Sequence, residues 1–144
     1  MKRIIPILTL SMIVMLGCKS NKNTVVNSRP ELDKNTVWVL TEIRGNEVTY
    51  SEGQQKATIR INPEAKLFDG DNGCNHYSGK FKDLGDGKMS LTDIIATKMA
   101  CPESFKLESS FMSALQKCDN YNLGEYTLEL KQGDKVMLTF EKTK

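Results

Sequence analysis

The residues best suited to chemistry gather in one short stretch, residues 68–79, with the sequence FDGDNGCNHYSG. It contains Cys74 and His76, the single histidine of the chain, two positions apart. On a strand this spacing places both side chains on one face, where they could bind a soft metal such as copper(I). The chain has no second histidine and no C-x-x-C pair, however, and methionine is equally suited to filling a core. The remaining soft ligands of such a site would be Met89, Met99, Cys101 and Met112.

Two other chemistries fit the same stretch less well. Asp69 and Asp71 resemble the start of a calcium loop, but Gly73 comes one position too early and Lys80 replaces the glutamate that ends such a loop. As an enzyme, the stretch would need His76 to activate the Cys74 thiol as a nucleophile. On a strand, a cysteine and a histidine separated by one residue have the wrong geometry for this, and no acid is placed to orient His76. The chain also lacks G-x-S-x-G, phosphate-loop and dinucleotide-binding motifs. We therefore expect no catalytic residue, no metal site and no cofactor.

The start of the chain has the layout of a bacterial secretory signal. Lys2 and Arg3 precede an apolar run over residues 4–16, which is shorter than the ~20 residues that a membrane-spanning helix needs. The run ends in MLGC at residues 15–18, which resembles a lipobox, the sequence that is cleaved before a lipid-modified cysteine. We expect residues 1–17 to be removed and Cys18 to carry fatty acyl chains such as palmitate, which anchor the protein to a membrane.

The mature chain is electrically balanced. Lys2 and Arg3 belong to the removed signal, so 18 of the 20 basic residues remain against 18 acidic ones. This balance gives no reason to expect nucleic acid as a partner. Residues 18–35 are mostly polar and contain Pro30, which predicts a flexible tether behind the lipid. The remaining residues, 36–144, have the length of a single domain.

Alternating apolar and polar residues predict short antiparallel strands, and GDG at 85–87 and QGD at 132–134 predict tight hairpins. Residues 102–117 instead have apolar residues at helical spacing, with Pro102 near the start. We predict one amphipathic helix packed against the sheet, which makes the fold α+β. The helical stripe consists of Leu107, Phe111, Leu115 and Cys118. The predicted strands cover residues 36–43, 57–61, 65–69, 77–82, 88–92, 94–98, 125–131 and 135–141.

Taken together, these residues resemble the META domain family over about residues 36–141. The resemblance implies a strongly curved, open barrel-like antiparallel sheet with the helix packed in it. It also implies a bacterial envelope setting linked to stress or drug tolerance, as in a heat-shock lipoprotein of the family, with no established reaction. The matching positions are Trp38, Leu40, GCN at 73–75, Tyr77, Gly79, Phe81, TKMAC at 97–101, Glu108, Phe111, Leu115, Tyr121, Leu128 and Leu130.

Four residues, Gly73, Asn75, Tyr77 and Gly79, form a candidate motif with a structural or a binding role. We expect Gly73 to adopt a backbone conformation that other residues resist. We also expect the Asn75 side chain to tie the turn to neighbouring backbone. A deep polar cleft around Asn75 and Tyr77 would instead favour an enzyme or an inhibitor of one.

Export places the cysteines in an oxidising compartment, where pairs form disulfides. Cys74 and Cys101 lie at the ends of two sheet segments, so we expect a disulfide between them that fastens the start of the helix to the turn. Spacing alone does not decide connectivity, and a pairing with Cys118 remains open. On the helical stripe, Cys118 also fits a buried free thiol.

The leading functional interpretation is a non-enzymatic lipoprotein of the cell envelope whose domain binds or protects something at the membrane surface. We expect a monomer anchored in the outer membrane, facing the periplasm, with an envelope protein as its partner. The alternative is a binder of a soft metal or a small ligand that uses Cys74, His76 and the methionines. An oxidised Cys74 would distinguish the two, because a disulfide sulfur is no longer a thiolate ligand.

Overall fold

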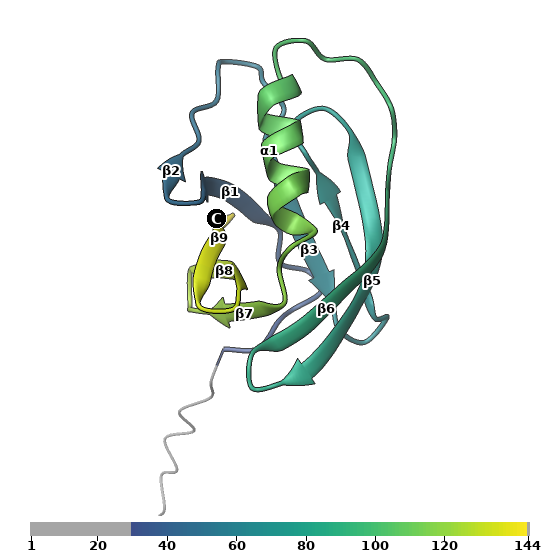
Figure 1. The fold of residues 1–144 in the computed structure, drawn as a ribbon, viewed down its shortest axis with the longest axis vertical. Coiled ribbons are helices and arrows are strands. Elements are labelled where there is room, and N and C mark those ends of the chain that lie inside the picture. The colour runs from purple at the N-terminus through teal and green to yellow at the C-terminus, as the bar shows by residue number, and fades with distance from the viewer. Residues whose placement is uncertain (1–29, 144) are drawn as a thin grey trace, which may run out of the picture.

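The sheet of this protein closes into a ring. The computed structural model describes residues 30–143, and in this range the chain forms nine strands, all paired antiparallel, and one helix (Figure 1). The strands are β1 (Trp38–Ile43), β2 (Asn46–Glu47), β3 (Thr58–Asn62), β4 (Leu67–Asp71), β5 (His76–Gly85), β6 (Lys88–Ala96), β7 (Asn120–Leu123), β8 (Thr127–Gln132) and β9 (Lys135–Lys142). The helix α1 (Phe105–Leu115) lies between β6 and β7 in the chain.

The ring has one firm closure and one weak seam. β1 pairs with β9 from Trp38 and Lys142 to Ile43 and Leu138, so the barrel is closed where the family resemblance implied an open one. Between β6 and β7 only one residue pair, Lys88 with Asn120, is formed. The chain between these two strands contains α1, which covers the opening of the barrel and packs mainly against β9 and β1 (Figure 1).

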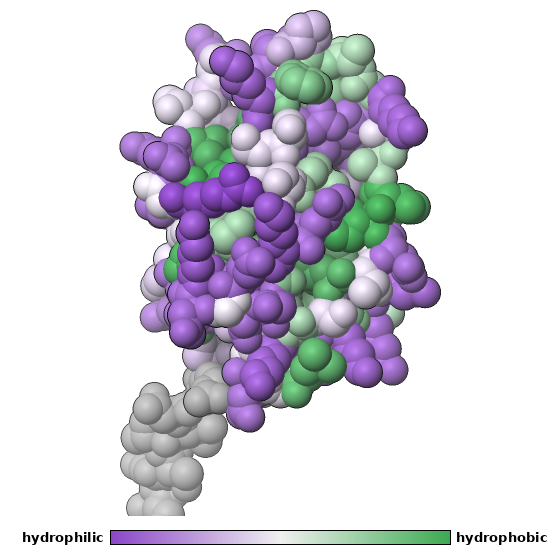
Figure 2. Space-filling view, viewed as in Figure 1, coloured by the Kyte–Doolittle hydropathy of each residue, from purple (hydrophilic) through white to green (hydrophobic). Residues whose placement is uncertain are grey.

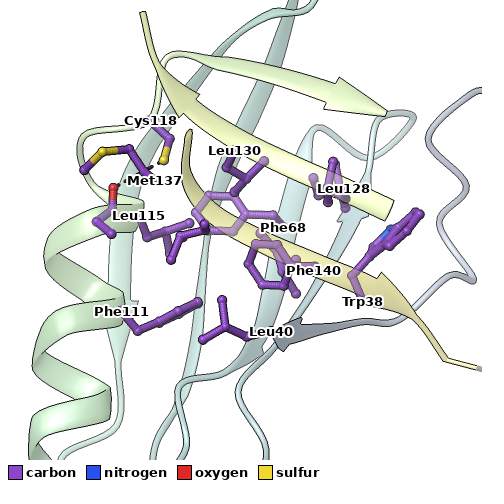
Figure 3. Packing of buried hydrophobic residues seen from close by; sticks show 14 of the residues in the cluster. Trp38, Leu40, Phe68, Phe111, Leu115, Cys118, Leu128, Leu130, Met137 and Phe140 are labelled. Atoms are coloured by element: carbon purple, nitrogen blue, oxygen red, sulfur yellow. Dashed lines mark hydrogen bonds between the residues drawn. The ribbon is translucent and has the colours of Figure 1, made fainter. Parts of the chain in front are cut away.

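Apolar residues at alternating positions of the strands point inward and fill the barrel interior. Phe111 and Leu115 of α1 point into it toward Leu40 and Phe140, so the helix completes the core (Figure 3). The rings of Phe111 and Phe140 meet edge to face with centroids 6.3 Å apart. The other buried apolar residues that the strands contribute are Trp38, Ile59, Ile61, Phe68, Tyr77, Phe81, Met89, Leu128, Leu130, Met137 and Leu138.

The helix is shorter than the sequence predicts. Residues 102–104 form a turn, in which the Ser104 N–H donates to the Cys101 carbonyl at 3.0 Å, and α1 begins only at Phe105. Its buried face is modest, because within the helix only Phe111, Ala114 and Leu115 are buried. Cys118 lies beyond the last helical residue, so its predicted place on the helical stripe is wrong, although its side chain is buried.

The strands agree with the predicted alternation, with three exceptions. The first is β2, a two-residue strand that was not predicted. The predicted segments 88–92 and 94–98 are joined in one strand, β6, which ends at Ala96 and leaves residues 97–98 outside it. Asp93, between the two segments, takes a left-handed φ of 53°, and the register with β5 shifts there. β7 carries the polar sequence NYNL and was not predicted; it forms because β8 pairs with it along its whole length. Both predicted hairpins are confirmed, with β5 and β6 joined through residues 86–87 and β8 and β9 through 133–134.

Contacts with the barrel begin slightly before residue 36. Leu32 packs against the core, and the Thr36 N–H donates to the Asp33 carbonyl at 3.0 Å. Cys18, the signal at residues 1–17 and most of the tether at 18–35 lie outside the described residues. Within residues 30–143 there is no helix long and apolar enough to cross a membrane.

Candidate binding site

The turn between β4 and β5 is organised by Asn72, whose side-chain oxygen accepts the N–H groups of Cys74 at 3.2 Å and Asn75 at 2.7 Å. Gly73 between them has a φ of 96°, a left-handed conformation that side chains rarely adopt. A Cβ atom there would lie 2.8 Å from the Leu107 side chain of α1. Both the backbone conformation and the contact with the helix therefore disfavour a larger residue at position 73. The unusual backbone conformation is the one that the sequence predicts for Gly73.

Asn75 is buried and connects the turn to the segment that follows β6. Its side-chain oxygen accepts the Met99 N–H at 2.6 Å and the Thr97 hydroxyl at 2.9 Å. Its amide nitrogen donates to the Met99 carbonyl at 3.3 Å, so it pairs with Met99 as a neighbouring strand would. The same nitrogen donates to a Glu108 carboxylate oxygen at 2.9 Å, which joins the segment to α1.

Glu108 is a site residue to which sequence reasoning gave no role. The same oxygen, Oε1, that accepts from Asn75 also accepts from the Asn72 amide at 3.2 Å. Glu108 belongs to the pattern that resembles the META family, but its partners are more than 30 residues away in the chain. Only the tertiary structure brings the two asparagines to the carboxylate.

A disulfide joins Cys74 and Cys101, as expected from their place at the ends of two segments, with Cα atoms 6.0 Å apart. It fixes the end of the 97–101 segment to the asparagine turn. Cys118 is the free cysteine of the described chain, and its thiol donates to the Ala114 carbonyl at 3.2 Å. Burial, aided by the nearby Asp119, raises the pKa of Cys118 to about 12, so this thiol stays protonated and unreactive.

Tyr77 and Gly79 serve the core. The Tyr77 hydroxyl donates to the Thr58 carbonyl at 2.7 Å, and its ring packs against Phe111 with centroids 5.5 Å apart. Burial raises its pKa well above the usual range, and the charges of nearby aspartates add to the shift. Gly79 lies against the Phe68 ring, where a Cβ atom would come within 2.7 Å. Both residues are buried, so their role is in packing the barrel.

The soft-metal alternative loses its central ligand. Cys74 is oxidised, so it offers no thiolate, and Met89 is buried in the core. The His76 side chain is exposed, with its Nδ1 3.6 Å from an Asp71 carboxylate oxygen. Within residues 30–143, no three His, Cys, Asp or Glu residues are placed to share a metal ion.

A groove of about 820 Å³ lies between α1 and the 97–101 segment. Its exposed lining is mostly apolar, and its polar residues include Asn75, Lys98 and Glu108. Met99 and Phe105 are exposed at 58% and 67%, which is unusual for large apolar side chains. Figure 2 shows apolar surface at the upper end of α1 and beside β6 on the same face. The remaining lining residues are Thr97, Ala100, Cys101, Pro102, Ser109 and Met112.

Sequence reasoning did not identify this groove. Met99 and Met112 were considered as possible metal ligands, Met99 also belongs to the TKMAC match at 97–101, and Phe105 lies in the predicted helix without a role of its own. An apolar residue on the outer face of an amphipathic helix is a weak signal by itself. It gains meaning only when the 97–101 segment is seen to run beside it.

The fold and site define a class of small antiparallel barrel that holds one helix in its opening and a disulfide-fixed segment beside that helix. The family model of the META domain matches residues 30–144. The chain therefore belongs to the META domain family, as its sequence pattern indicated.

Solved structures confirm the fold. An NMR structure of a protein from Burkholderia xenovorans is 23% identical, with a TM-score of 0.61, and the match covers 96% of this chain and 99% of that one. A second NMR structure is 24% identical, with a TM-score of 0.57, over 75% of this chain and 89% of that one. No curated protein matches the sequence.

Proposed function

We propose that this protein is a non-enzymatic lipoprotein of the bacterial cell envelope that binds a protein partner through the groove beside α1. The signal at residues 1–17 is removed, Cys18 carries the lipid, and the tether over 18–35 leads to the META domain. The protein is a monomer in the outer membrane, faces the periplasm and protects the envelope under stress. The single observation that carries the binding role is the open apolar groove around Met99 and Phe105.

The construction of the groove supports a binding role over a catalytic one. The Asn75 amide is occupied by Met99, Thr97 and Glu108. The carboxylate of Glu108 accepts from two asparagine amides. These polar groups hold the walls of the groove together, so they are engaged in structure and not aimed at a substrate.

The place where the described chain begins supports a partner in the periplasm. Pro30 borders the same surface hollow as Gly85 and Gly87, at the β5–β6 turn. The groove lies at the opposite end of the barrel, near the start of α1 (Figure 1). The described chain therefore begins at the end of the barrel opposite the groove, which favours a groove that is accessible from the periplasm.

A small apolar ligand is a second candidate, because the volume of the groove falls in the ~300–1,000 Å³ range of small-molecule sites. Solvent extraction of the purified protein followed by mass spectrometry tests it. A stoichiometric compound that disappears in the Ser109→Trp variant would favour this candidate over a protein partner.

The anchor is tested by intact mass and fractionation of the full-length protein expressed in a bacterium. The mature chain is expected to begin at residue 18 with an added acyl mass and to enter the outer-membrane fraction. Cys18→Ser is expected to leave the protein without lipid and outside the membranes. A wild-type chain that begins elsewhere, with Cys18 unmodified, would refute the anchor.

The groove is tested by photo-crosslinking in living cells. A photoreactive residue at Phe105 is compared with one at Tyr126, which is equally exposed at 65% but lies before β8 on another part of the barrel. We expect a discrete protein adduct from position 105 and none from 126. Equal labelling from both positions, or none from 105, contradicts a partner at the groove.

A further inference from the structure

We infer that the partner enters the groove as an extended peptide segment, which pairs with the backbone of Lys98 and Ala100 as an added β-strand. This inference rests on the proposed binding function and names its mode. It requires an unused strand edge, a facing wall for side chains, and a reason to exclude other occupants.

The 97–101 segment continues the line of β6 and uses only one of its two edges. The Thr97 N–H donates to the His76 carbonyl at 3.0 Å, and Met99 pairs through both its N–H and its C=O with the Asn75 side chain. In an extended chain, the backbone groups of the alternate residues point the opposite way. In the described part of the protein, no hydrogen bond reaches the backbone N–H or C=O of Lys98 or Ala100.

This unused edge belongs to the groove. Lys98 and Ala100 both line it, and α1 forms the facing wall with Phe105, Ser109 and Met112. β7 does not cover the edge, because its pairing with β6 stops at Lys88. Backbone hydrogen bonds along an exposed edge, with pockets for alternate side chains, are the ordinary means of binding an extended peptide.

The N-terminal tether of the same chain is a poor occupant. Twelve residues, 18–29, separate the lipid from Pro30 and reach at most about 43 Å when fully extended. The groove lies at the far end of the barrel, and β5 alone, with ten residues, is about 33 Å long. Filling the groove would consume the whole tether and pull the membrane against it. The segment must come from another protein.

Charge complementarity indicates what that segment carries. Lys98 is the one cation that lines the groove, and none of the ion pairs in residues 30–143 involves it. A lysine on a free edge discourages pairing with strands that lack a compensating charge. An acidic residue opposite Lys98 removes that penalty. The expected segment is therefore extended, with an acidic side chain beside Lys98 and an apolar one over Phe105 and Met112.

The experiment uses the mature chain, residues 18–144, with Cys18→Ser to keep it in solution. A library of displayed random twelve-residue peptides is selected against it, and the selected peptides are synthesised. Amide hydrogen exchange is then measured with and without each peptide. We expect peptides with an acidic and an apolar position, and slower exchange at the amides of Lys98 and Ala100 when they bind.

Three test variants and one control variant separate backbone pairing from other modes of binding. Ala100→Pro removes one donor of the edge and is expected to weaken binding about tenfold. Ser109→Trp fills the groove and is expected to do the same or more. Ser110→Trp, the matched control, adds the same side chain at a neighbouring exposed helical position outside the groove lining and is expected to change affinity less than about twofold. Lys98→Glu should weaken acidic peptides about threefold or more and lose this effect in high salt.

Unchanged exchange at Lys98 and Ala100 on peptide binding overturns the inference, as does a library that yields no binder. Hydrogen exchange at Lys98 and Ala100 is measured on the protein with an unaltered edge, so the test remains decisive even if Ala100→Pro does not fold. The proposed function fails separately, through the crosslinks from position 105. A protein adduct there, combined with selected peptides that leave the edge amides unaffected, would keep the binding role and reject strand addition.

Discussion

Replacing Asn75 with alanine should destabilise the domain strongly, because one buried side chain joins three segments. The amide accepts from Met99 and Thr97 and donates to the Glu108 carboxylate. Alanine removes these bonds and leaves the Met99 N–H without its partner. A neutral hydrogen bond contributes about 1 kcal/mol and one to a charged group about 1.5 to 3. With the half-buried Glu108 at the lower end of that range, the expected loss is about 3 to 4 kcal/mol.

The assay is urea unfolding of the oxidised domain followed by circular dichroism, with Asn122→Ala as the matched control. The Asn122 amide also donates to a carboxylate, Glu129, at 3.1 Å, but Asn122 and this hydrogen bond are exposed. The control should lose at most about 0.5 kcal/mol. A loss below about 1 kcal/mol for Asn75→Ala, or equal losses for the two variants, would show that the buried amide does not hold the segments together.

Three further outcomes follow from the same structure. Removing the disulfide with Cys74→Ala and Cys101→Ala should lower the free energy of unfolding by about 3 to 4 kcal/mol, because the bond closes a loop of sequence separation 27. Non-reducing peptide mapping should find Cys118 as the one free thiol of residues 30–143. Gly73→Val should cost about 2 kcal/mol more than Gly53→Val in thermal unfolding, because both glycines have positive φ but only Gly73 has a neighbouring side chain in the way; equal costs would contradict this. The Cys118 pKa of about 12 lies above its ordinary value of 9.0, so the folded state holds this proton longer than the unfolded state and loses stability as the pH rises from about 9 to 12. Cys118→Ala should lack that part of the alkaline loss, and identical pH profiles for the two proteins would refute the assignment.

Local sequence signals predicted most of the strands and both tight hairpins, because period-two alternation and glycine turns act over a few residues. They failed where tertiary contacts override local preference. β7 has little apolar character and becomes a strand through its pairing with β8. Pro102 suggested a helix start, but the chain uses residues 102–104 as a turn between the disulfide and α1.

The candidate site was predictable only in part. Gly73, Asn75 and the cysteines attracted attention because their residue types have special conformations or chemistry. The partners of Asn75 could not be inferred, since Glu108 and Met99 are each more than 20 positions away. The sequence alone does not distinguish an asparagine that is buried and bonded to backbone from one on the surface.

The sequence by itself determined the family, the alternation that fills the core and the oxidisable cysteines, because these depend on residue type and short spacing. Only the tertiary structure decided that β1 meets β9 and that β6 separates from β7 after Lys88. That separation leaves Lys98 and Ala100 on one wall of a groove whose other wall is α1. The physical reason is that ring closure and an unused strand edge result from the summed register and curvature of nine strands, which no short segment encodes.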